Sequence, residues 1–202
     1  MNKISITSRT DLEIRRTLAF WYSLSTKETK EAGKAWYADA QAFANKLGKE
    51  FDLNPYVAAG VISALSPNNK WERNKIDARA VCVAWSKGLQ ADSVKVCTYN
   101  ANKEKAFRIL EGEMITEKSP KTHAFAMNIG LNSPDHITVD KWHLRACCLT
   151  PDDGIKPCVE SCTALQYRRV EAITASLAHD LRLKGYEFQA IVWLTIKEAW
   201  NR

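Results

Sequence analysis

The stretch Asn54-Pro-Tyr-Val-Ala-Ala-Gly-Val-Ile-Ser-Ala-Leu-Ser-Pro67 decides the fold class of this chain. Asn54 followed by Pro55 is typical of a helix start, because proline is favoured in the first turn of a helix. The residues from Tyr56 to Ser66 carry no charge. A helix without a polar face does not suit a surface position, so this segment is predicted to run through the core.

Apolar residues recur at helical rather than alternating intervals along nearly the whole chain, which predicts an all-α protein. Gly88 and Gly185 are expected to end helices, and Asp135 to lie in a turn. The longest irregular stretches are expected at 89–99 and 150–160. Helices are predicted over residues 11–24, 28–50, 55–65, 70–88, 101–112, 120–130, 140–149, 161–184 and 186–201.

The length and the net charge of the chain limit its possible domain organisation and binding partners. The 202 residues suit a single all-α domain over 1–202, or two closely packed lobes. The 29 basic and 23 acidic side chains give a net charge of +6, which favours nucleic acid as a partner, although many proteins without a polyanion partner carry such a surplus. No apolar run is long enough for a bilayer and no signal peptide opens the chain, so we expect a cytoplasmic protein with no membrane partner.

The six cysteines are expected to be mainly reduced thiols, because most lie in apolar helical contexts of a chain expected inside the cell. Four of them gather between 147 and 162, and thiolates bind zinc or iron-sulfur clusters. Their spacing matches no standard zinc finger, so no metal site is predicted. The cysteines are Cys82, Cys97, Cys147, Cys148, Cys158 and Cys162.

A polar elbow follows the apolar helix, in the stretch Ser66-Pro-Asn-Asn-Lys-Trp-Glu-Arg-Asn-Lys75. Its amide, hydroxyl, aromatic and basic groups suit a nucleotide, because amides can read the edge of an extruded base while an aromatic ring stacks on it. A Ser-Pro turn with a helix cap and a core-anchoring tryptophan is the alternative. The candidate substrate-binding residues are Ser66, Asn68, Asn69, Trp71 and Asn74.

Two further residues are candidates for chemistry, and they lie 19 positions apart. Lys121 begins the stretch Lys-Thr-His-Ala-Phe-Ala-Met-Asn-Ile-Gly, and Asp140 lies within Ile-Thr-Val-Asp-Lys-Trp-His-Leu-Arg. Taken singly, Lys121 suits a solvated surface position, and Asp140 suits a helix cap. As a pair, an amine and a carboxylate in one cleft are suited to chemistry at a sugar carbon.

The two segments resemble the centre of the helix-hairpin-helix base-excision DNA glycosylases, the endonuclease III-like superfamily. In that family a lysine just after the hairpin and an aspartate in a Val-Asp-x-His-type segment share one cleft. The elbow is similar to the family's Leu-Ser-Ala-Gln-like elbow, which an Asn-Lys-Ala helix follows. The resemblance covers about residues 50–148. It implies a two-lobed helical fold and DNA as the partner, with no cofactor; we expect a monomer.

The resemblance also implies roles for the residues. Asp140 would stabilise the positive charge that builds on the sugar as the base leaves. Lys121 would attack the sugar carbon and form a Schiff base if desolvation outweighs the attraction of the neighbouring carboxylate. His143 and Arg145 are candidates for contacting phosphate or orienting the carboxylate, with a packing role as the alternative for His143.

The chain departs from the family at the hairpin, where Thr116-Glu-Lys-Ser-Pro120 replaces Leu-Pro-Gly-Val-Gly. Side chains at the glycine positions would hinder close approach of a phosphate, so Lys118 and Ser119 are candidates for a substitute contact. No cysteine follows Cys162, so the family's C-terminal iron-sulfur ligands are absent from this sequence.

The expected activity is therefore that of a DNA glycosylase in base excision, a hydrolase that also acts as an AP lyase if Lys121 is the nucleophile. Two alternatives stay open. One is a glycosylase-like enzyme of the kind that bacteriophages use to make hypermodified DNA bases. The other is a DNA-binding module that keeps the scaffold without the chemistry.

Overall fold

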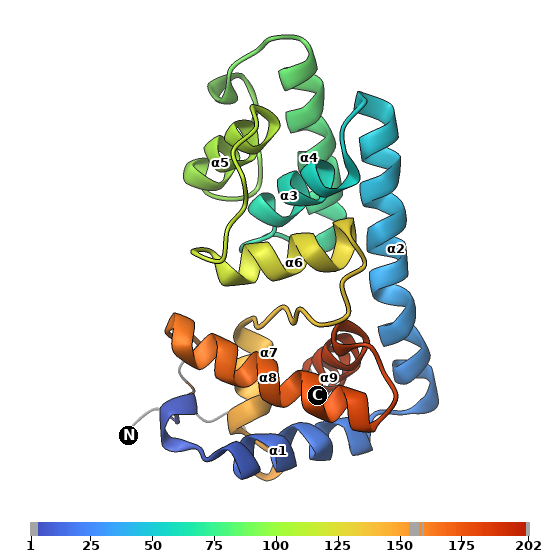
Figure 1. The fold of residues 1–202 in the computed structure, drawn as a ribbon, viewed down its shortest axis with the longest axis vertical. Coiled ribbons are helices and arrows are strands. Elements are labelled where there is room, and N and C mark those ends of the chain that lie inside the picture. The colour runs from blue at the N-terminus through green and yellow to red at the C-terminus, as the bar shows by residue number, and fades with distance from the viewer. Residues whose placement is uncertain (1–3, 154–157, 159, 201–202) are drawn as a thin grey trace. The chain divides into compact units, whose positions relative to one another are not determined.

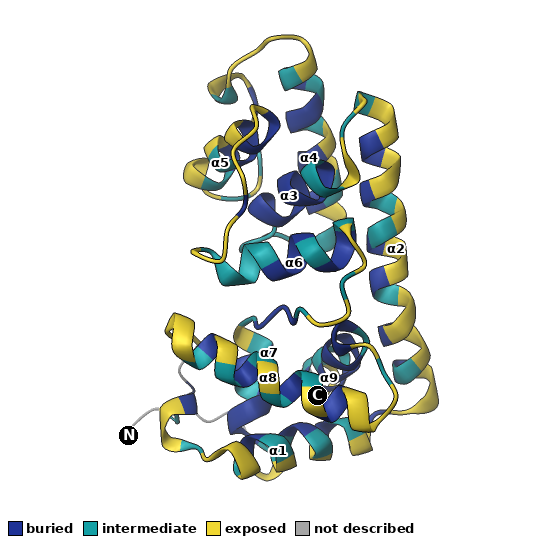
Figure 2. Ribbon diagram, viewed as in Figure 1, coloured by how far each residue is buried: buried dark blue, intermediate teal, exposed yellow. Residues whose placement is uncertain are grey.

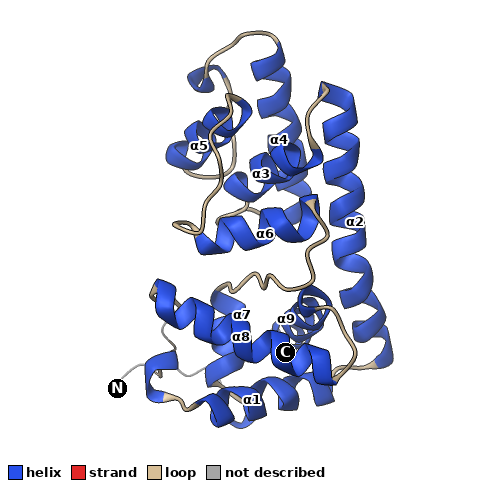
Figure 3. Ribbon diagram, in the orientation of Figure 1, coloured by secondary structure: helices blue, strands red, loops and turns tan. Residues whose placement is uncertain are grey.

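The computed structural model describes residues 4–153, 158 and 160–200 of the chain. Helices and connecting loops make up this described part, which contains no strand (Figure 3). One isolated parallel bridge joins Ile4 to Cys158. The all-α prediction is confirmed. Among these residues no helix has both the length and the apolar character needed to cross a bilayer.

The chain divides into two compact units (Figure 1). Unit 1 comprises Met1–Ala38 and Pro134–Arg202, and unit 2 comprises Asp39–Ser133. Helix α2, Lys27–Phe51, contributes its first residues to unit 1 and its remainder to unit 2. The stretch 50–148, singled out in the sequence, crosses this division, because its last residues belong to unit 1.

Unit 1 is built around α1, which contacts three other helices of the unit. Helix α9 contacts α7 and α8 as well, so the four helices share one core. Trp21 of α1 is completely buried there, and its indole nitrogen donates a hydrogen bond to the Leu149 carbonyl oxygen at 2.7 Å. The elements are η1 (Ile6–Ser8), α1 (Asp11–Leu24), α7 (Lys141–Cys148), η3 (Pro151–Asp153), α8 (Ala164–Asp180) and α9 (Gly185–Trp200).

Unit 2 has α3 at its centre, in contact with α4, α5 and α6. Every residue of α3 from Ala58 to Leu65 is buried (Figure 2), which confirms the prediction that this helix runs through the core. A Cβ atom added at Gly60 would lie 2.6 Å from Ile115 Cδ1, so the absence of a side chain lets the loop after α5 pack closely. The elements are α3 (Pro55–Leu65), α4 (Trp71–Ser86), η2 (Ala91–Ser93), α5 (Asn100–Leu110) and α6 (Pro120–Gly130).

Most predicted helix ends lie within three residues of the observed ones, and the start of α3 shows why. The Asn54 side chain accepts a hydrogen bond from Tyr56 N at 2.8 Å, as an N-cap residue should. Gly88 follows α4 with a φ of 69°, which confirms it as a helix stop. Asp135 lies in a turn, as predicted. In the second irregular stretch, residues 154–157 and 159 lie outside the described residues, as does residue 201 of the last predicted helix.

The prediction for Gly185 is wrong. Helix α8 ends at Asp180, and Gly185 is the first residue of α9. Its backbone nitrogen donates to the Pro134 carbonyl oxygen at 3.0 Å, and an added Cβ would lie 2.7 Å from that oxygen. Glycine therefore permits a close backbone approach at this position instead of a left-handed helix end.

Candidate functional site

The predicted site residues fall in three places in the structure. The elbow between α3 and α4 and the start of α6 both belong to unit 2, whereas the start of α7 belongs to unit 1. Lys121 is therefore a residue of unit 2, and Asp140 is a residue of unit 1. Each place has its own geometry.

The elbow is held together by Asp77 of α4, a buried carboxylate with 1% of its side chain exposed. It accepts hydrogen bonds from Asn69 Nδ2 at 2.9 Å, from Arg73 Nε at 2.7 Å, and from Cys97 N at 2.8 Å. Because a buried charge must be paired, this network ties the elbow, α4 and the segment before α5 into one structure. Asn69 also donates to the Leu65 carbonyl oxygen at 3.3 Å, so its amide N–H groups serve the elbow itself.

Asn74 corrects one sequence prediction. It is 1% exposed, and its Nδ2 donates to the Ile62 carbonyl oxygen of α3 at 3.0 Å. Asn74 therefore packs α4 against α3 within the core and does not line the surface of the elbow. Its Oδ1 and the hydroxyl oxygen of Ser63 are both buried, with no hydrogen-bond partner among the described residues.

Trp71 is the first residue of α4 and packs between two other aromatic rings. The ring of Phe43 on α2 lies 6.1 Å from its centroid, and the ring of Phe125 on α6 lies 6.5 Å away, both in edge-to-face arrangements. The Lys75 ammonium lies 5.7 Å above the same indole. These contacts pack Trp71 against α2 and α6 and leave it half-buried, and its role in substrate binding stays a prediction.

Asn68 and Tyr99 form the outer surface of the elbow. Asn68 adopts a left-handed conformation, with a φ of 57°, and is exposed. Its Nδ2 donates to the Tyr99 hydroxyl at 3.0 Å, and the Tyr99 side chain is 65% exposed. The Thr98 hydroxyl donates to the Pro67 carbonyl oxygen at 2.8 Å beside them. The two residues thus present an amide edge and an aromatic ring together.

Sequence reasoning missed Tyr99, although the polar stretch from Cys97 to Asn100 around it offered a signal. Its contact with Asn68 spans 31 positions, so only the tertiary structure could reveal it. Ser66 is the C-cap residue of α3, and its carbonyl oxygen accepts a hydrogen bond from Asn69 N at 3.2 Å. Ser66 therefore closes the turn on which Asn68 is displayed.

Basic side chains surround the start of α6. Ser119 is the N-cap residue, but its side chain makes no capping hydrogen bond and instead accepts one from Lys105 Nζ at 3.0 Å. Lys118 is exposed, and Lys121, in the first turn, is half-buried. Burial lowers the pKa of the Lys105 ammonium. Positive side chains and a helix N-terminus favour an anion at the same place.

Asp140 is the N-cap residue of α7, because its Oδ1 accepts a hydrogen bond from His143 N at 2.8 Å. Asp140 therefore caps the helix, and its catalytic role stays a prediction. The preceding residues are buried, and the Tyr167 hydroxyl accepts from Val139 N at 3.1 Å and donates to the Ile137 carbonyl oxygen at 2.6 Å. The chain entering α7 is therefore anchored, and the half-buried carboxylate has a fixed position within unit 1.

His143 corrects a second prediction, since it is completely buried and therefore not placed to contact phosphate. Its Nε2 lies 2.9 Å from the Thr174 hydroxyl oxygen, and that hydroxyl donates to the Val170 carbonyl oxygen at 2.8 Å. Because the Thr174 hydroxyl already donates its proton to Val170, it can only accept from the histidine. Nε2 of the neutral imidazole is therefore the donor, and Nδ1 is unprotonated. Burial lowers the pKa of His143 to about 4. The packing alternative is confirmed.

Arg145 lies two residues after His143 in α7 and is held by contacts within unit 1. Its guanidinium forms an ion pair with Glu160. The same group lies 4.6 Å from the ring centroid of Trp142 and 5.7 Å from that of Trp200. Because its charge is already paired and stacked, a phosphate at Arg145 would compete with Glu160.

No disulfide joins the six cysteines, all of which lie among the described residues, as expected for reduced thiols. Cys147 and Cys148 are buried at the end of α7, and Cys97 is the exposed member of the set. In the parts of the chain that the structure describes, no three His, Cys, Asp or Glu side chains are grouped so that they could hold a metal ion.

The fold and these residues define an all-α protein of two helical units, with polar groups concentrated at one elbow and two helix starts. The chain belongs to a family of unknown function (DUF7178), whose match extends over residues 1–200. No curated protein and no solved structure shows a significant match to the chain.

Proposed function

We propose that the chain is a DNA glycosylase that releases a modified or damaged base, with AP-lyase activity through Lys121. The proposal rests mainly on Asp140, whose half-buried carboxylate is fixed at the start of α7. Cleaving an N-glycosidic bond develops positive charge on the sugar, and a preorganised anion stabilises that charge without reorganising as the bond breaks. The N-terminus of a helix also favours the ionised carboxylate.

Lys121 contributes the second group in this proposal. Its neutral amine attacks the anomeric carbon of the sugar as the bond to the base breaks, and the base leaves with the electron pair and takes up a proton. The sugar ring then opens as the C1′–O4′ bond breaks, and the proton lost from the nitrogen passes to O4′, which yields a Schiff base between the lysine and the sugar. Loss of a C2′ proton eliminates the 3′ phosphate and cleaves the strand, and hydrolysis of the Schiff base returns the amine.

Base recognition is proposed for Asn68 and Tyr99. An exposed aromatic ring offers a stacking surface, and the amide of Asn68 offers both a donor and an acceptor to the edge of a base. The bond from Asn68 to the Tyr99 hydroxyl fixes that amide edge. Lys118 and Ser119 at the start of α6 are proposed to contact phosphate, because the basic side chains there favour an anion.

One observation favours a second candidate, an enzyme that modifies a base without excising it. The turn before α6 closes with a hydrogen bond from Ser119 N to the Thr116 carbonyl oxygen at 3.0 Å, and it contains no glycine. Side chains in that turn hinder the close backbone approach by which a hairpin holds duplex DNA. The two candidates are separated by whether free base is released.

The proposal is tested by borohydride trapping on labelled oligonucleotides that carry abasic, oxidised, deaminated, alkylated or hypermodified bases. A covalent adduct with the wild-type protein is expected, and Lys121→Ala should abolish it. Lys118→Ala separates the loss of a proposed phosphate contact from the loss of the nucleophile: it should weaken DNA binding but still yield the adduct at saturating oligonucleotide. Adducts that form equally well with Lys121→Ala would overturn the role of Lys121.

Asp140→Asn tests the carboxylate with little change in stability, because asparagine caps helices as well as aspartate does. Release of free base should fall by about 100-fold or more, as expected when a preorganised electrostatic contact is lost. Binding should be nearly unchanged. If both free-base release and trapping are absent from the wild-type protein while salt-sensitive DNA binding persists, the glycosylase proposal fails and a binding module replaces it.

A further inference from the structure

Unit 1 carries a row of partly exposed tryptophans that the proposed base chemistry does not use. Trp193, Lys197 and Trp200 lie at positions i, i+4 and i+7 of α9, so they share one face of that helix. All three are half-buried, as are Trp36 of α2 and Trp142 of α7, which contact the two indoles of α9. We call these five residues, together with Lys141, the tryptophan stripe.

The indoles of the tryptophan stripe are held in place by aromatic contacts within unit 1. The ring centroid of Trp193 lies 5.8 Å from that of Trp36. At the other end of the stripe, the Trp200 ring lies 6.4 Å from Trp142 in an edge-to-face arrangement and 6.5 Å from the buried Trp21. The rings are therefore already ordered, and a ligand that stacks on them does not have to immobilise them first.

A lysine lies over an indole at each end of the tryptophan stripe. Lys197 Nζ lies 4.2 Å from the ring centroid of Trp193, and Lys141 Nζ lies 5.9 Å from that of Trp142. Among the described residues, neither ammonium has a carboxylate partner, in contrast to Arg145 with Glu160. Because a partly exposed lysine keeps its ammonium in water, each ammonium marks a ring face that solvent can reach.

This combination of groups selects the kind of ligand. Accessible aromatic faces with unpaired cations beside them match the alternating bases and phosphates of a single nucleic-acid strand. A duplex hides the faces of its bases by stacking them on each other, and an acidic peptide offers charge without flat rings. A base that stacks on an indole gains more than an exposed cation–π contact provides, so it displaces the ammonium, which is then released to pair with a phosphate.

We propose that the tryptophan stripe binds single-stranded DNA, with bases stacked on Trp193 and Trp142 and with Lys197 and Lys141 paired to phosphates. From Trp193 to Trp200 the helix rises about 10 Å, which is the length of about three stacked nucleotides. Lys141 directly follows Asp140, so a strand on the stripe passes the start of α7. The inference takes DNA as the partner from the proposed function, but it uses none of the residues to which chemistry is assigned there.

The test follows the tryptophan fluorescence of the full chain during titration with a deoxythymidine oligonucleotide of about ten nucleotides. Stacking of bases on the indoles should quench the fluorescence, whereas the same sequence in a duplex should quench it far less. Trp193→Leu should weaken binding by about 5-fold or more through the loss of one stacked base. Trp85→Leu is the matched control, because Trp85 is a half-buried tryptophan of α4 in unit 2, and it should leave the affinity unchanged.

A second variant avoids any change in the packing of the indoles. Lys197→Gln should lower the affinity and reduce the slope of log affinity against log salt by about 0.7, as expected when one phosphate contact to a single strand is lost. Lys87→Gln removes an exposed lysine of unit 2 and should change neither quantity. Circular dichroism melting checks that each variant is folded.

Three results would overturn the inference. The first is unchanged affinity and unchanged quenching in both Trp193→Leu and Lys197→Gln. The second is equally tight binding of polyglutamate, which would identify an acidic protein as the occupant. The third is a fluorescence change when the protein is diluted without DNA, which would identify a second copy of the chain as the occupant.

Failure of this inference can be told apart from failure of the proposed function. If Trp193→Leu binds DNA as the wild type does while the wild type forms the borohydride adduct, the tryptophan stripe is wrong and the glycosylase proposal stands. If the wild type forms no adduct and releases no base, yet Trp193→Leu weakens binding as expected, the glycosylase proposal is wrong and the tryptophan stripe stands.

Discussion

Acid sensitivity through His143 is the sharpest quantitative prediction. The imidazole is completely buried, and burial lowers its pKa to about 4 in the folded protein. An unfolded chain has a histidine pKa of about 6.5, so the unfolded state binds the proton first as the pH falls. The stability that neutral His143 contributes is therefore fully present above pH 6.5 and is lost as the pH falls towards 4.

The size of the effect follows from the difference between the two pKa values. That difference is about 2.5 units, and each unit corresponds to about 1.4 kcal/mol, so about 3 kcal/mol of stability is lost between pH 7.5 and pH 4. This is a large share of the roughly 5–15 kcal/mol that stabilises a typical folded protein. Neutral His143 keeps the hydrogen bond between its Nε2 and the Thr174 hydroxyl oxygen.

The assay compares wild type with His143→Gln by urea unfolding at half-unit steps from pH 7.5 to pH 4. Glutamine can still donate to the Thr174 hydroxyl but does not titrate, so subtracting the variant removes the contribution of all other groups. The variant should be the less stable protein at pH 7.5, and its deficit should shrink by about 3 kcal/mol by pH 4. A pH-independent deficit, or an NMR titration of His143 near pH 6.5, would show that burial does not lower the pKa of His143.

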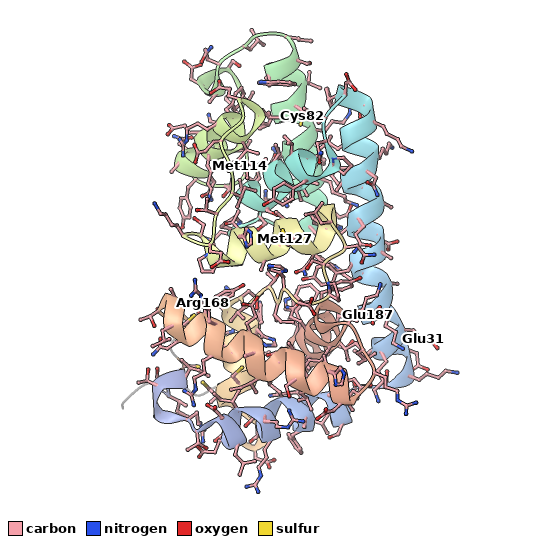
Figure 4. All side chains as sticks on the ribbon, viewed as in Figure 1. Glu31, Cys82, Met114, Met127, Arg168 and Glu187 are labelled. Atoms are coloured by element: carbon pink, nitrogen blue, oxygen red, sulfur yellow. The ribbon has the colours of Figure 1, made fainter. Side chains whose placement is uncertain are left out.

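Three further predictions concern packing, the elbow and base recognition. Gly130→Ala should destabilise the protein by about 1–3 kcal/mol in urea unfolding, because its Cβ would lie 2.9 Å from Tyr56 Cα; an unchanged unfolding midpoint would contradict this packing. Asp77→Ala should lower the free energy of unfolding by about 3 kcal/mol or more, because it leaves Arg73 and Asn69 without their buried acceptor. A thermal melting curve that does not change would contradict this hydrogen-bond network. Tyr99→Ala should weaken binding of fluorescein-labelled single-stranded oligonucleotides by about 10-fold through lost stacking, whereas Tyr99→Phe should keep affinity and reduce discrimination between bases. Replacement of exposed Met114, on the loop after α5, by Ala should change neither the affinity for oligonucleotides nor the discrimination between bases (Figure 4).

The positions of most helices could be predicted from the sequence alone. The predicted bounds of α1, α3 and α6 coincide with the observed ones, because periodic apolar residues and local caps such as Asn54 act over a few positions. The central burial of α3 followed from its lack of charge. These features depend on neighbours along the chain, so one sequence is enough to find them.

The roles of the polar side chains depend on how the helices pack. Asn74 and His143 have residue types that suit a site, yet both are buried and bonded to distant segments. Tyr99 gains its place beside Asn68 from a contact across 31 positions, and Gly185 begins a helix because Pro134 approaches it. Burial and partners depend on how helices pack, and no local pattern encodes that packing. The sequence of this protein therefore identified the candidate residues, and the packing of its helices determined which of them are buried in the core and which are exposed to solvent.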